Sequence, residues 1–390
     1  MKPLRILYVS DIFYPYPGGV SEHIDNLARF LRKRGHETFI LTANFKSGIE
    51  YNDPDYVIRM GRSIKIPINK SLGSITVSIR LNKLVKKFMS NNHFHIVHVH
   101  GPIAVGLPSL ALLYSRSINV ATFHSAHEEM LLYKIFKGYI KMYFEKLHGK
   151  IAVSELAKRS ISRYFDSNYR IIPNGIDVQR FNLHNQKISF LANDDSKKIL
   201  FVGRIEPRKG LKYLILALNE VIKFIPNVKL VIVGDSPFKA LYKQYISKDI
   251  KDKVIFVGRV GYEELPKYYA SCDVFVSPAT EKESFGIVLL EAMASKIPVI
   301  ASNIEGYRQV IKDEINGFLF ENKNYKDLAN KIIMVLKNRT LVNRVVEKAY
   351  IEVLEKYSWE VVSKKIENYY YELLSNSSIM SFNDILERNS

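Results

Sequence analysis

Short apolar runs alternate with longer amphipathic segments throughout the second half of this 390-residue chain. The apolar runs are rich in β-branched residues and lie at residues 199–202, 229–233, 254–257, 274–277 and 299–301. Each run has the length and composition of a buried strand, and a helical segment separates it from the next. Strict alternation of this kind predicts an α/β fold with a parallel, doubly wound sheet.

The first half begins in the same way, with an apolar run at residues 4–10. A glycine loop follows, and then an amphipathic helix from about Ser21 to Arg34. The order strand, glycine loop, helix is typical of a phosphate site, because the loop allows close approach and the helix start offers free N–H groups. The dinucleotide fingerprint G-x-G-x-x-G follows neither this run nor residues 199–202, which disfavours a dehydrogenase.

Residues 181–197 are polar and without periodicity, which indicates a linker. We therefore expect an N-terminal domain at residues 1–180, a C-terminal domain at residues 198–357, and a cleft lined by the carboxyl ends of both sheets. The trio Ser358-Trp359-Glu360 is expected to cap a last helix that runs to about Leu374. The polar tail at residues 375–390 is expected to fray.

The chain has 57 Lys and Arg against 39 Asp and Glu, and the resulting charge of +18 indicates an anionic partner. Residues 56–127 contain no acidic residue at all. Within them, residues 78–90 predict an amphipathic helix, whose apolar face holds Leu81, Leu84, Val85 and Phe88 and whose basic face holds Arg80, Lys83 and Lys87. We expect this helix, and a similar segment at residues 133–150, to bind an anionic membrane surface, although solvated lysines are the simpler explanation.

The positive charge could also bind nucleic acid. No recognised nucleic-acid-binding module is visible, however, so nucleic acid is not expected as a partner. No apolar run approaches the roughly 20 residues that a membrane span needs, and a signal peptide is not expected. Cys272 is the one cysteine, which excludes a disulfide framework within the chain.

Four histidines lie close together at residues 93, 95, 98 and 100. Alternate strand residues share a face, so a metal site has to be considered. Neither a carboxylate nor a cysteine accompanies them, and their neighbours are apolar, so we expect a buried strand and no metal site. His100 and His124 each end an apolar run, where the active-site loops of α/β folds lie.

Two glutamates flank a tight turn at residues 283–291. Glu283 precedes the turn through Gly286, and Glu291 lies one helical turn into an apolar helix that is expected to begin at Ile287. A glutamate on a helix is usually solvated, but here its neighbours are apolar, so the carboxylate needs a partner. Two carboxylates beside free turn amides suit a ligand rich in hydroxyl groups.

Three motifs occur in the order and spacing of a known family. They are Pro17-Gly18-Gly19-Val20, Gly203-Arg204 with Pro207-Arg208-Lys209-Gly210, and the E-x7-E pair Glu283 and Glu291. Over almost the whole chain, to about Leu374, the sequence resembles the family 4 glycosyltransferases of GT-B fold. Residues 120–125, 151–157, 172–177 and the basic helix are most similar to bacterial phosphatidylinositol mannosyltransferases.

The resemblance implies a fold of two Rossmann-like domains facing a cleft, with the C-terminal helix crossing back to the N-terminal domain. It implies that Arg204 and Lys209 hold the diphosphate of a nucleotide sugar, that Glu283 binds sugar hydroxyls, and that His124 lies by the anomeric carbon. Glu291 would accept from the ribose hydroxyls. The donor site would be completed by Gly18, Gly19, Arg259, Val260, Ser284, Phe285, Gly286 and Ile287, and membrane docking would involve Arg80, Lys83, Lys86 and Lys87.

The resemblance implies a retaining enzyme that moves a hexose, foremost mannose from GDP-mannose, onto a phosphatidylinositol-type lipid at the cytoplasmic face of a membrane. No partner carboxylate for a double displacement is evident, so we expect same-face attack, with no prosthetic group or metal. The likeness is loose at residues 66–78, which leaves the acceptor open. The alternative is a UDP-sugar-dependent transferase that builds a lipid-linked oligosaccharide or another glycan.

Overall fold

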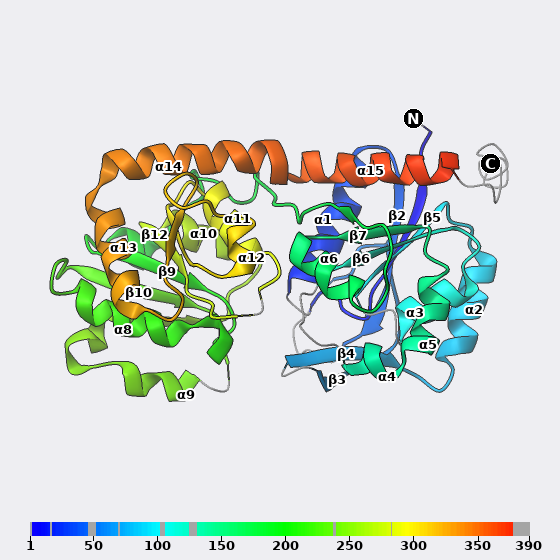
Figure 1. The fold of residues 1–390 in the computed structure, drawn as a ribbon, viewed down its shortest axis with the longest axis horizontal. Coiled ribbons are helices and arrows are strands. Elements are labelled where there is room, and N and C mark those ends of the chain that lie inside the picture. The colour runs from blue at the N-terminus through cyan, green and yellow to red at the C-terminus, as the bar shows by residue number, and fades with distance from the viewer. Residues whose placement is uncertain are drawn as a thin grey trace. The chain divides into compact units, whose positions relative to one another are not determined.

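The computed structural model describes residues 2–15, 18–45, 52–68, 71–101, 106–124, 131–236, 239–281 and 283–376, without the side chains of residues 65–74, 131 and 132. The chain divides into two compact units, one formed by Met1–Gly175 with Trp359–Ser390 and the other by Ile176–Ser358 (Figure 1). Each unit contains one α/β sheet, as the alternating pattern predicts. Residues 377–390 of the expected frayed tail lie outside the described residues.

The sheet of the first unit has the order β4-β3-β2-β1-β5-β6-β7-β8. Its strands are β1 (Arg5–Val9), β2 (Glu37–Asn44), β3 (Val57–Ile68), β4 (Ser71–Val77), β5 (Ile96–His100), β6 (Ile118–Phe123), β7 (Gly149–Ala152) and β8 (Arg170–Ile171). Neighbouring strands are parallel except β3 and β4, which pair antiparallel at the edge. The sequence analysis did not predict this pair, whose short connection is what antiparallel pairing allows.

Helices cover both faces of this sheet. Alternate side chains of β1 belong to the two different hydrophobic cores on these faces. Leu7 and Val9 join the core under α2 (Leu81–Asn91), α3 (Leu107–Tyr114), α5 (Lys137–Phe144) and α6 (Glu155–Ser162). Ile6 and Tyr8 join a second core under α1 (Gly19–Lys33) and α15 (Trp359–Asn376). The sheet is therefore doubly wound, as predicted, because alternate strand residues point to opposite faces.

Helix α15 packs against α1, which confirms that the C-terminal helix returns to the N-terminal region (Figure 1). Glu367 of α15 accepts from Arg34 Nε at 2.8 Å and lies 2.7 Å from His36 Nε2. The hydroxyl of Ser358, the residue expected to cap α15, donates to the Leu354 carbonyl at 2.9 Å, in the π-helical turn that precedes this helix.

The sheet of the second unit is entirely parallel, in the order β11-β10-β9-β12-β13-β14. Its strands are β9 (Lys197–Val202), β10 (Val228–Val233), β11 (Val254–Gly258), β12 (Val274–Ser277), β13 (Val299–Ser302) and β14 (Phe318–Phe320). All five strands predicted for this half are present, whereas β14 is too short to give a periodic signal. Its helices are α7 (Ser189–Ala192), α8 (Leu211–Val221), α9 (Lys239–Tyr242), α10 (Leu265–Ala270), α11 (Ile287–Ala294), α12 (Glu305–Arg308), α13 (Tyr325–Lys337) and α14 (Arg339–Glu352).

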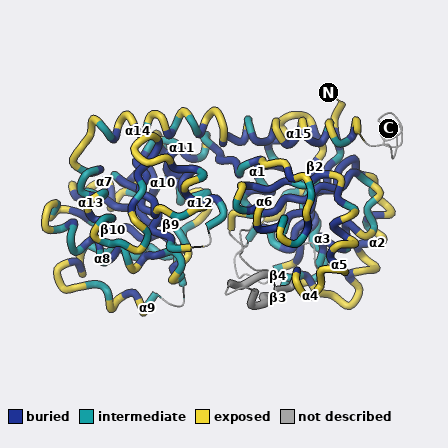
Figure 2. Tube along the Cα trace, viewed as in Figure 1, coloured by how far each residue is buried: buried dark blue, intermediate teal, exposed yellow. Residues whose placement is uncertain are grey.

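Two predicted helices differ in detail from the structure. Helix α2 begins at Leu81 rather than at residue 78, and its buried face contains Met89 in place of Leu84, which is 44% exposed. The segment at residues 133–150 contains the end of α4 (Leu131–Ile135), all of α5, and the start of β7. Figure 2 shows buried residues on the strands and inner helix faces of each unit. Among the described helices, none is both long and apolar enough to cross a membrane.

Candidate functional site

Three neighbouring strands of the second unit end at glycines, namely Gly203 after β9, Gly234 after β10 and Gly258 in β11. The Gly234 N–H donates to the Gly258 carbonyl at 2.8 Å, and a Cβ on Gly234 would lie 1.9 Å from the Gly203 carbonyl oxygen. The backbones are thus in close contact at the carboxyl edge of the sheet. This edge is where parallel α/β sheets bind their ligands.

The loop after β9 is held rigidly against the loop after β12. It ends in a 3₁₀ turn, Pro207–Lys209, and at Gly210, which has a left-handed φ of 71°. A Cβ on Gly210 would lie 1.8 Å from the Pro278 carbonyl oxygen. The Thr280 N–H donates to the Arg208 carbonyl at 2.8 Å. Glycine is required here both by the backbone conformation and by the space.

Glu283 lies at the centre of the charged groups on these two loops. Its Oε1 atom lies 2.7 Å from Lys209 Nζ and 2.7 Å from Arg208 Nη1. Burial raises the pKa of Glu283, but Lys209 and Arg208 outweigh this effect, so the pKa lies below its usual value. The carboxylate is therefore ionised at neutral pH.

Glu206 completes this cluster by pairing with Arg204 at 2.9 Å and with Arg208 at 3.1 Å. Three cations and two carboxylates leave one net positive charge, which suits an anion that approaches the loop. Site roles were predicted from the sequence for Arg204, Lys209 and Glu283, but not for Arg208 or Glu206. The signal for Arg208 was present, because the loop carries three cations within six residues.

The turn after Glu283 has the predicted form. Gly286 adopts a left-handed φ of 88°, and α11 begins at Ile287 with no side chain capping its first turn. A Cβ on Gly286 would lie 2.7 Å from the Tyr307 ring. The Phe285 side chain is buried in the core, so Phe285 can meet a ligand only through its backbone.

Glu291 is buried in α11, as the apolar sequence around it predicts. Its Oε2 atom accepts a hydrogen bond from the Tyr269 hydroxyl of α10 at 2.6 Å. This is the partner that a buried carboxylate needs, and the sequence analysis did not identify it. Arg259 and Val260 follow β11, two strands away from β9; Arg259 is exposed and Val260 packs against the core.

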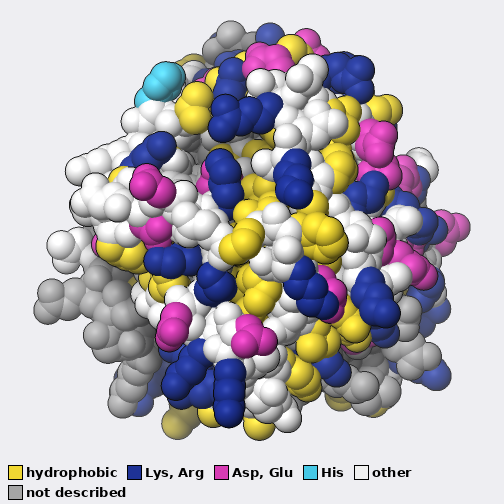
Figure 3. Space-filling model, turned by 90° about the vertical axis from the view of Figure 1, so that its left-hand side faces the viewer, with side chains coloured by type: hydrophobic (Ala, Val, Ile, Leu, Met, Phe, Trp, Pro, Cys, Tyr) yellow, Lys and Arg dark blue, Asp and Glu magenta, His cyan; other side chains and the backbone are white. Residues whose placement is uncertain are grey.

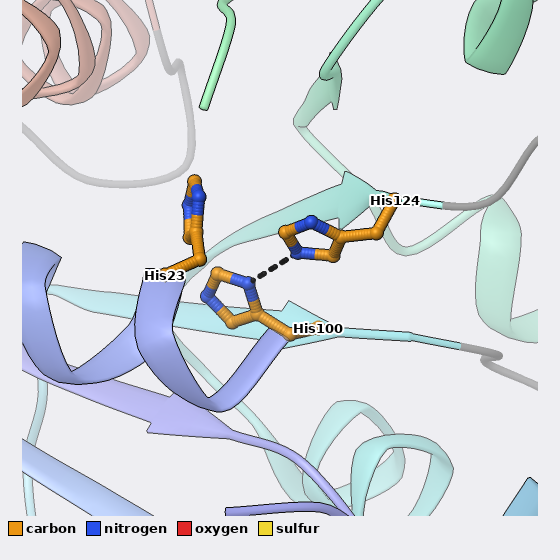
Figure 4. A group of neighbouring side chains, drawn as sticks. All are labelled: His23, His100 and His124. Atoms are coloured by element: carbon orange, nitrogen blue, oxygen red, sulfur yellow. Dashed lines mark hydrogen bonds between the residues drawn. The ribbon is translucent and has the colours of Figure 1, made fainter. Parts of the chain in front are cut away.

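In the first unit, the strand-end histidines come together with a third. His100 ends β5 and His124 follows β6, and the His100 Nδ1 and His124 Nε2 atoms are 3.1 Å apart. His23, on the buried face of α1, lies against both (Figure 4). His23 was not among the site residues predicted from the sequence, although its position four residues before Leu27 on an amphipathic helix indicates burial.

Burial lowers the pKa of all three imidazoles. The pKa of His23 falls to about 4, and those of His100 and His124 fall well below the usual value, with neighbouring histidines adding to the effect. The three rings are therefore neutral at pH 7. Neutral imidazoles can accept a proton or coordinate a metal, but they do not attract an anion.

Gly18 is the N-cap of α1, and Gly19 is its first residue. No side chain caps this helix, and the Glu22 N–H donates to the Gly18 carbonyl at 3.0 Å. The absence of a side-chain cap at Gly18, within the described residues, agrees with a glycine loop that approaches a ligand closely. Pro17 of this motif lies outside the described residues.

The four basic residues predicted to dock on a membrane, Arg80, Lys83, Lys86 and Lys87, are all exposed on and just before α2. Helix α2 packs against α3, which contacts α5. Helices α4 and α5 expose further apolar side chains beside lysines, namely Ile135, Phe136, Tyr139 and Met142. By contrast, the face of the second unit in Figure 3 mixes acidic and basic side chains.

Two family models match the chain. The one described as Glycosyltransferase Family 4 matches residues 17–180, and the one described as Glycosyl transferases group 1 matches residues 184–352. The phosphatidyl-myo-inositol mannosyltransferase of Mycolicibacterium smegmatis is 34% identical over 377 residues, covering 96% of this chain and 95% of that protein. The alpha-monoglucosyldiacylglycerol synthase of Streptococcus pneumoniae is 27% identical, over 96% of this chain and 87% of that protein.

Solved structures share the fold. A glycosyltransferase from Rickettsia africae superposes with a TM-score of 0.75 at 21% identity, covering 97% of this chain and all of that chain. A sucrose-phosphate synthase from Thermosynechococcus elongatus gives 0.73 at 20% identity, over 96% of this chain and all of the other. Both are structures of the GT-B fold, in agreement with the prediction from sequence.

Proposed function

Because this chain belongs to glycosyltransferase family 4, and is thus a retaining hexosyltransferase that uses a nucleotide sugar, we propose that it transfers mannose from GDP-mannose to a phosphatidylinositol-type lipid. The observation that carries this proposal is the 34% identity to a phosphatidyl-myo-inositol mannosyltransferase, which spans nearly the full length of both proteins. A relative of the same name from Mycobacterium leprae supports it, at 32% identity over 96% of this chain and 98% of that protein.

In this proposal the charged cluster of the second unit binds the diphosphate of the donor. Departure of GDP leaves negative charge on the β-phosphate, and fixed cations stabilise that charge in the transition state. Lys209 and Arg204 supply the positive charge, and the loop contacts at Gly210 and Thr280 hold Lys209 in position. Lys209 must then share its ammonium between Glu283 and the phosphate, which three donor hydrogens allow.

Glu283 and the turn after it bind the hexose. The ionised carboxylate accepts hydrogen bonds from sugar hydroxyls, while backbone amides at the start of α11 donate to the phosphate or to a sugar oxygen. Glu291 accepts from the ribose hydroxyls in the same scheme. Its bond from Tyr269 occupies one carboxylate oxygen and holds the group in a fixed orientation.

The acceptor attacks the anomeric carbon on the face from which GDP departs. The acceptor O–C1 bond forms as the C1–phosphate bond breaks, and the acceptor proton passes to the departing phosphate oxygen. The configuration at C1 is thereby retained without a covalent enzyme intermediate. His124, whose imidazole is neutral, is proposed to accept a hydrogen bond from the sugar or from the attacking hydroxyl.

Membrane binding by the first unit would bring the enzyme to a lipid acceptor. The exposed cations on α2 attract anionic headgroups, and the exposed apolar residues of α4 and α5 are suited to insertion at the headgroup boundary. No acidic residue occurs in the first turn of α2, α3, α4 or α5 to offset this charge. We therefore propose that the enzyme binds peripherally to a membrane, on its cytoplasmic face.

The alternative is a UDP-sugar-dependent transferase. The similarity to an alpha-monoglucosyldiacylglycerol synthase favours it, because that protein's name describes a glucosylated lipid. Both relatives' names include a lipid, so the two candidates differ in the donor and the headgroup more than in the kind of acceptor.

A donor panel tests the two candidates together. The full chain is incubated with extracted lipids and with GDP-mannose, UDP-glucose or UDP-N-acetylglucosamine, and the product lipid is identified by its mass. The proposal expects a hexose added to a phosphatidylinositol from GDP-mannose alone. Turnover of a UDP-sugar without turnover of GDP-mannose would replace it with the alternative.

A further inference from the structure

We propose that His23, His100 and His124 form a binding site for a borderline transition-metal cation of the zinc class. The three imidazoles reach one small volume from α1, from the end of β5 and from the residue after β6 (Figure 4). One ring nitrogen of each lies within 4.8 Å of the others. Three convergent nitrogen donors on rigid elements are the set that zinc uses when a fourth position is left to water.

The closest pair already has the spacing of two ligands of one ion. His100 Nδ1 and His124 Nε2 are 3.1 Å apart. Two nitrogens bound to a tetrahedral zinc, each at about 2.0–2.1 Å from it, lie about 3.3 Å from each other. A cation bound to both atoms would replace their mutual hydrogen bond by two coordinate bonds, and both rings would turn so that their lone pairs meet at the ion.

His23 is held as a metal ligand is usually held. Its Nδ1 atom lies 3.0 Å from Asn174 Oδ1, which can only accept, so Nδ1 carries the proton and Nε2 carries the lone pair. The His23 Nε2 atom is buried without a hydrogen-bond partner in the described part of the chain. A hydrogen bond at one ring nitrogen that orients the other is the usual second contact of a ligating histidine.

The donor set selects the class of cation. Among the described residues the group contains imidazoles and neither a carboxylate nor a thiolate. Magnesium and calcium prefer oxygen donors, whereas imidazole suits zinc, copper, nickel and cobalt. Zn²⁺ is the ion to test first, and Co²⁺ reports the same geometry through its visible spectrum.

From the sequence no metal site is expected, because the only group of four histidines near one another along the chain, at residues 93–100, is not accompanied by a carboxylate or a cysteine. Of these, only His100 belongs to the group. The neighbouring His98 is excluded, since its two ring nitrogens lie 2.6 Å from the Tyr370 hydroxyl and 2.7 Å from the Thr122 hydroxyl. The other two ligands come from segments far away in the sequence.

A bound cation would also regulate the enzyme, a consequence that rests on the proposed function. Coordination occupies His124 Nε2 and so withdraws this imidazole from the sugar or the acceptor. Zinc is therefore expected to inhibit transfer reversibly, and a chelator is expected to restore it.

The binding test uses the full chain without a polyhistidine tag, stripped with EDTA and dialysed. Titration with Co²⁺ is expected to give a visible d–d spectrum of a four-coordinate ion that saturates at one equivalent and is abolished by Zn²⁺. X-ray absorption of the zinc form is expected to show three imidazole ligands at about 2.0 Å. Absence of a saturable one-to-one site, or an oxygen-only shell, would overturn the proposal.

Variants locate the site. His23→Gln and His100→Gln are each expected to weaken Zn²⁺ binding at least tenfold, by about the amount that loss of a ligand or its support costs. His98→Gln, in a buried neighbour whose nitrogens are both occupied, and His184→Gln, in the second unit, are expected to leave Zn²⁺ affinity unchanged. Equal affinity in His23→Gln and the wild type, both folded by near-ultraviolet circular dichroism, would contradict the assignment.

Should His23→Gln fail to fold, His124→Gln takes its place, because His124 is the least buried of the three. The spectroscopic and variant arms need no sugar transfer, so they stand even if the proposed reaction is wrong. Zinc inhibition that persists unchanged in a folded variant lacking one ligand would contradict the regulatory consequence while leaving the transferase assignment intact.

Discussion

Lys209 Nζ lies 2.7 Å from Glu283 Oε1, which joins the loop after β9 to the loop after β12 by an ion pair. Both side chains are largely shielded from water, at 17% and 11% exposure, so the pair is screened far less than one on the surface. The same oxygen also receives Arg208. The groups proposed to hold the diphosphate and the hexose are therefore coupled before any ligand arrives.

Removal of the Lys209 ammonium is expected to abolish most transfer while leaving the fold intact. In Lys209→Ala, Glu283 keeps its contact with Arg208, so no carboxylate is left without a partner. We expect kcat/KM to fall about 10²- to 10³-fold, because a fixed cation is lost from the departing phosphate. The control is Lys212→Ala, an exposed lysine at the start of α8. An equal loss in both variants would contradict the role of Lys209.

Neutralisation of Glu283 is expected to separate sugar recognition from diphosphate binding. Glu283→Gln raises the net charge of the cluster by one, so GDP is expected to bind severalfold more tightly. Transfer is expected to fall about 100-fold, because an ionised acceptor for the sugar hydroxyls is lost. Calorimetry with GDP and a turnover assay with GDP-mannose measure the two effects. Parallel losses in both would indicate a purely structural role.

Gly210→Ala is expected to displace the cation loop, for reasons of space more than of backbone conformation. The new Cβ would lie 1.8 Å from the Pro278 carbonyl oxygen, a contact with backbone that cannot move freely. Gly258→Ala is a matched control, because Gly258 also has a left-handed φ, of 88°, but nothing within 4 Å of an added Cβ. The control should cost about 1 kcal/mol of unfolding free energy and Gly210→Ala clearly more, with weaker GDP binding only in the latter. Denaturant unfolding and GDP titration measure both.

The ion pairs of Glu367 predict a pH dependence of the first unit. Burial raises the pKa of Glu367, but Arg34 and His36 outweigh it, so the folded-state pKa lies below its usual value. His36 Nδ1 accepts from the Leu4 N–H at 3.0 Å, so it is Nε2 that donates to Glu367. The stabilisation is complete above the unfolded-state pKa of about 4.3 and is lost as the pH falls through the folded-state pKa.

Trp359, the one tryptophan in the chain, is buried in α15 of this unit and reports its unfolding by fluorescence. Glu367→Gln is expected to cost about 1–3 kcal/mol at pH 7 and to flatten the loss of stability below about pH 4.5. A wild-type curve and a variant curve that remain parallel from pH 7 to pH 3.5 would show that Glu367 does not carry the dependence.

The sequence predicted the repeating elements well, because their signals are local. The turn at Gly286 and the start of α11 at Ile287 follow from a glycine between a glutamate and an apolar run, and the structure has both. The strands of the second unit follow from β-branched runs between helices. The edge strands β3 and β4 were missed because they lie in the acid-free segment, which was interpreted by its charge instead of its periodicity.

Contacts between distant segments could not be predicted in this way. The Tyr269 hydroxyl on Glu291 and the meeting of His23 with His100 depend on how helices pack on sheets, and a single sequence gives no register between them. Glu206 and Arg208 could have been predicted, since both lie in the loop whose residues Arg204 and Lys209 were expected to hold the diphosphate. The sequence does not show that Glu283 contacts that loop, and this contact is what identifies Arg208 as part of the site.

Substitution of the basic residues of α2 is expected to weaken membrane binding without affecting the donor site. Replacing Arg80, Lys83, Lys86 and Lys87 by serine removes four charges that attract anionic lipid, each worth about 1 kcal/mol near the surface. Cosedimentation with phosphatidylserine-containing vesicles should therefore fall steeply, while GDP affinity stays as in the wild type. Increasing salt should reduce wild-type binding in the same direction, because the attraction is electrostatic.

The control removes the same charge from the second unit, by substitution of the exposed residues Lys243, Lys248, Lys251 and Arg339 with serine. Similar cosedimentation losses in both variants would mean that net charge, and not α2, determines binding. Phe136→Ser with Met142→Ser tests the apolar contribution of α5 and the segment before it, whose side chains are 47–50% exposed. If insertion of apolar side chains contributes, the Phe136→Ser and Met142→Ser pair lowers the vesicle binding that persists at high salt. The serine variant of α2 is expected to leave that salt-resistant binding unchanged.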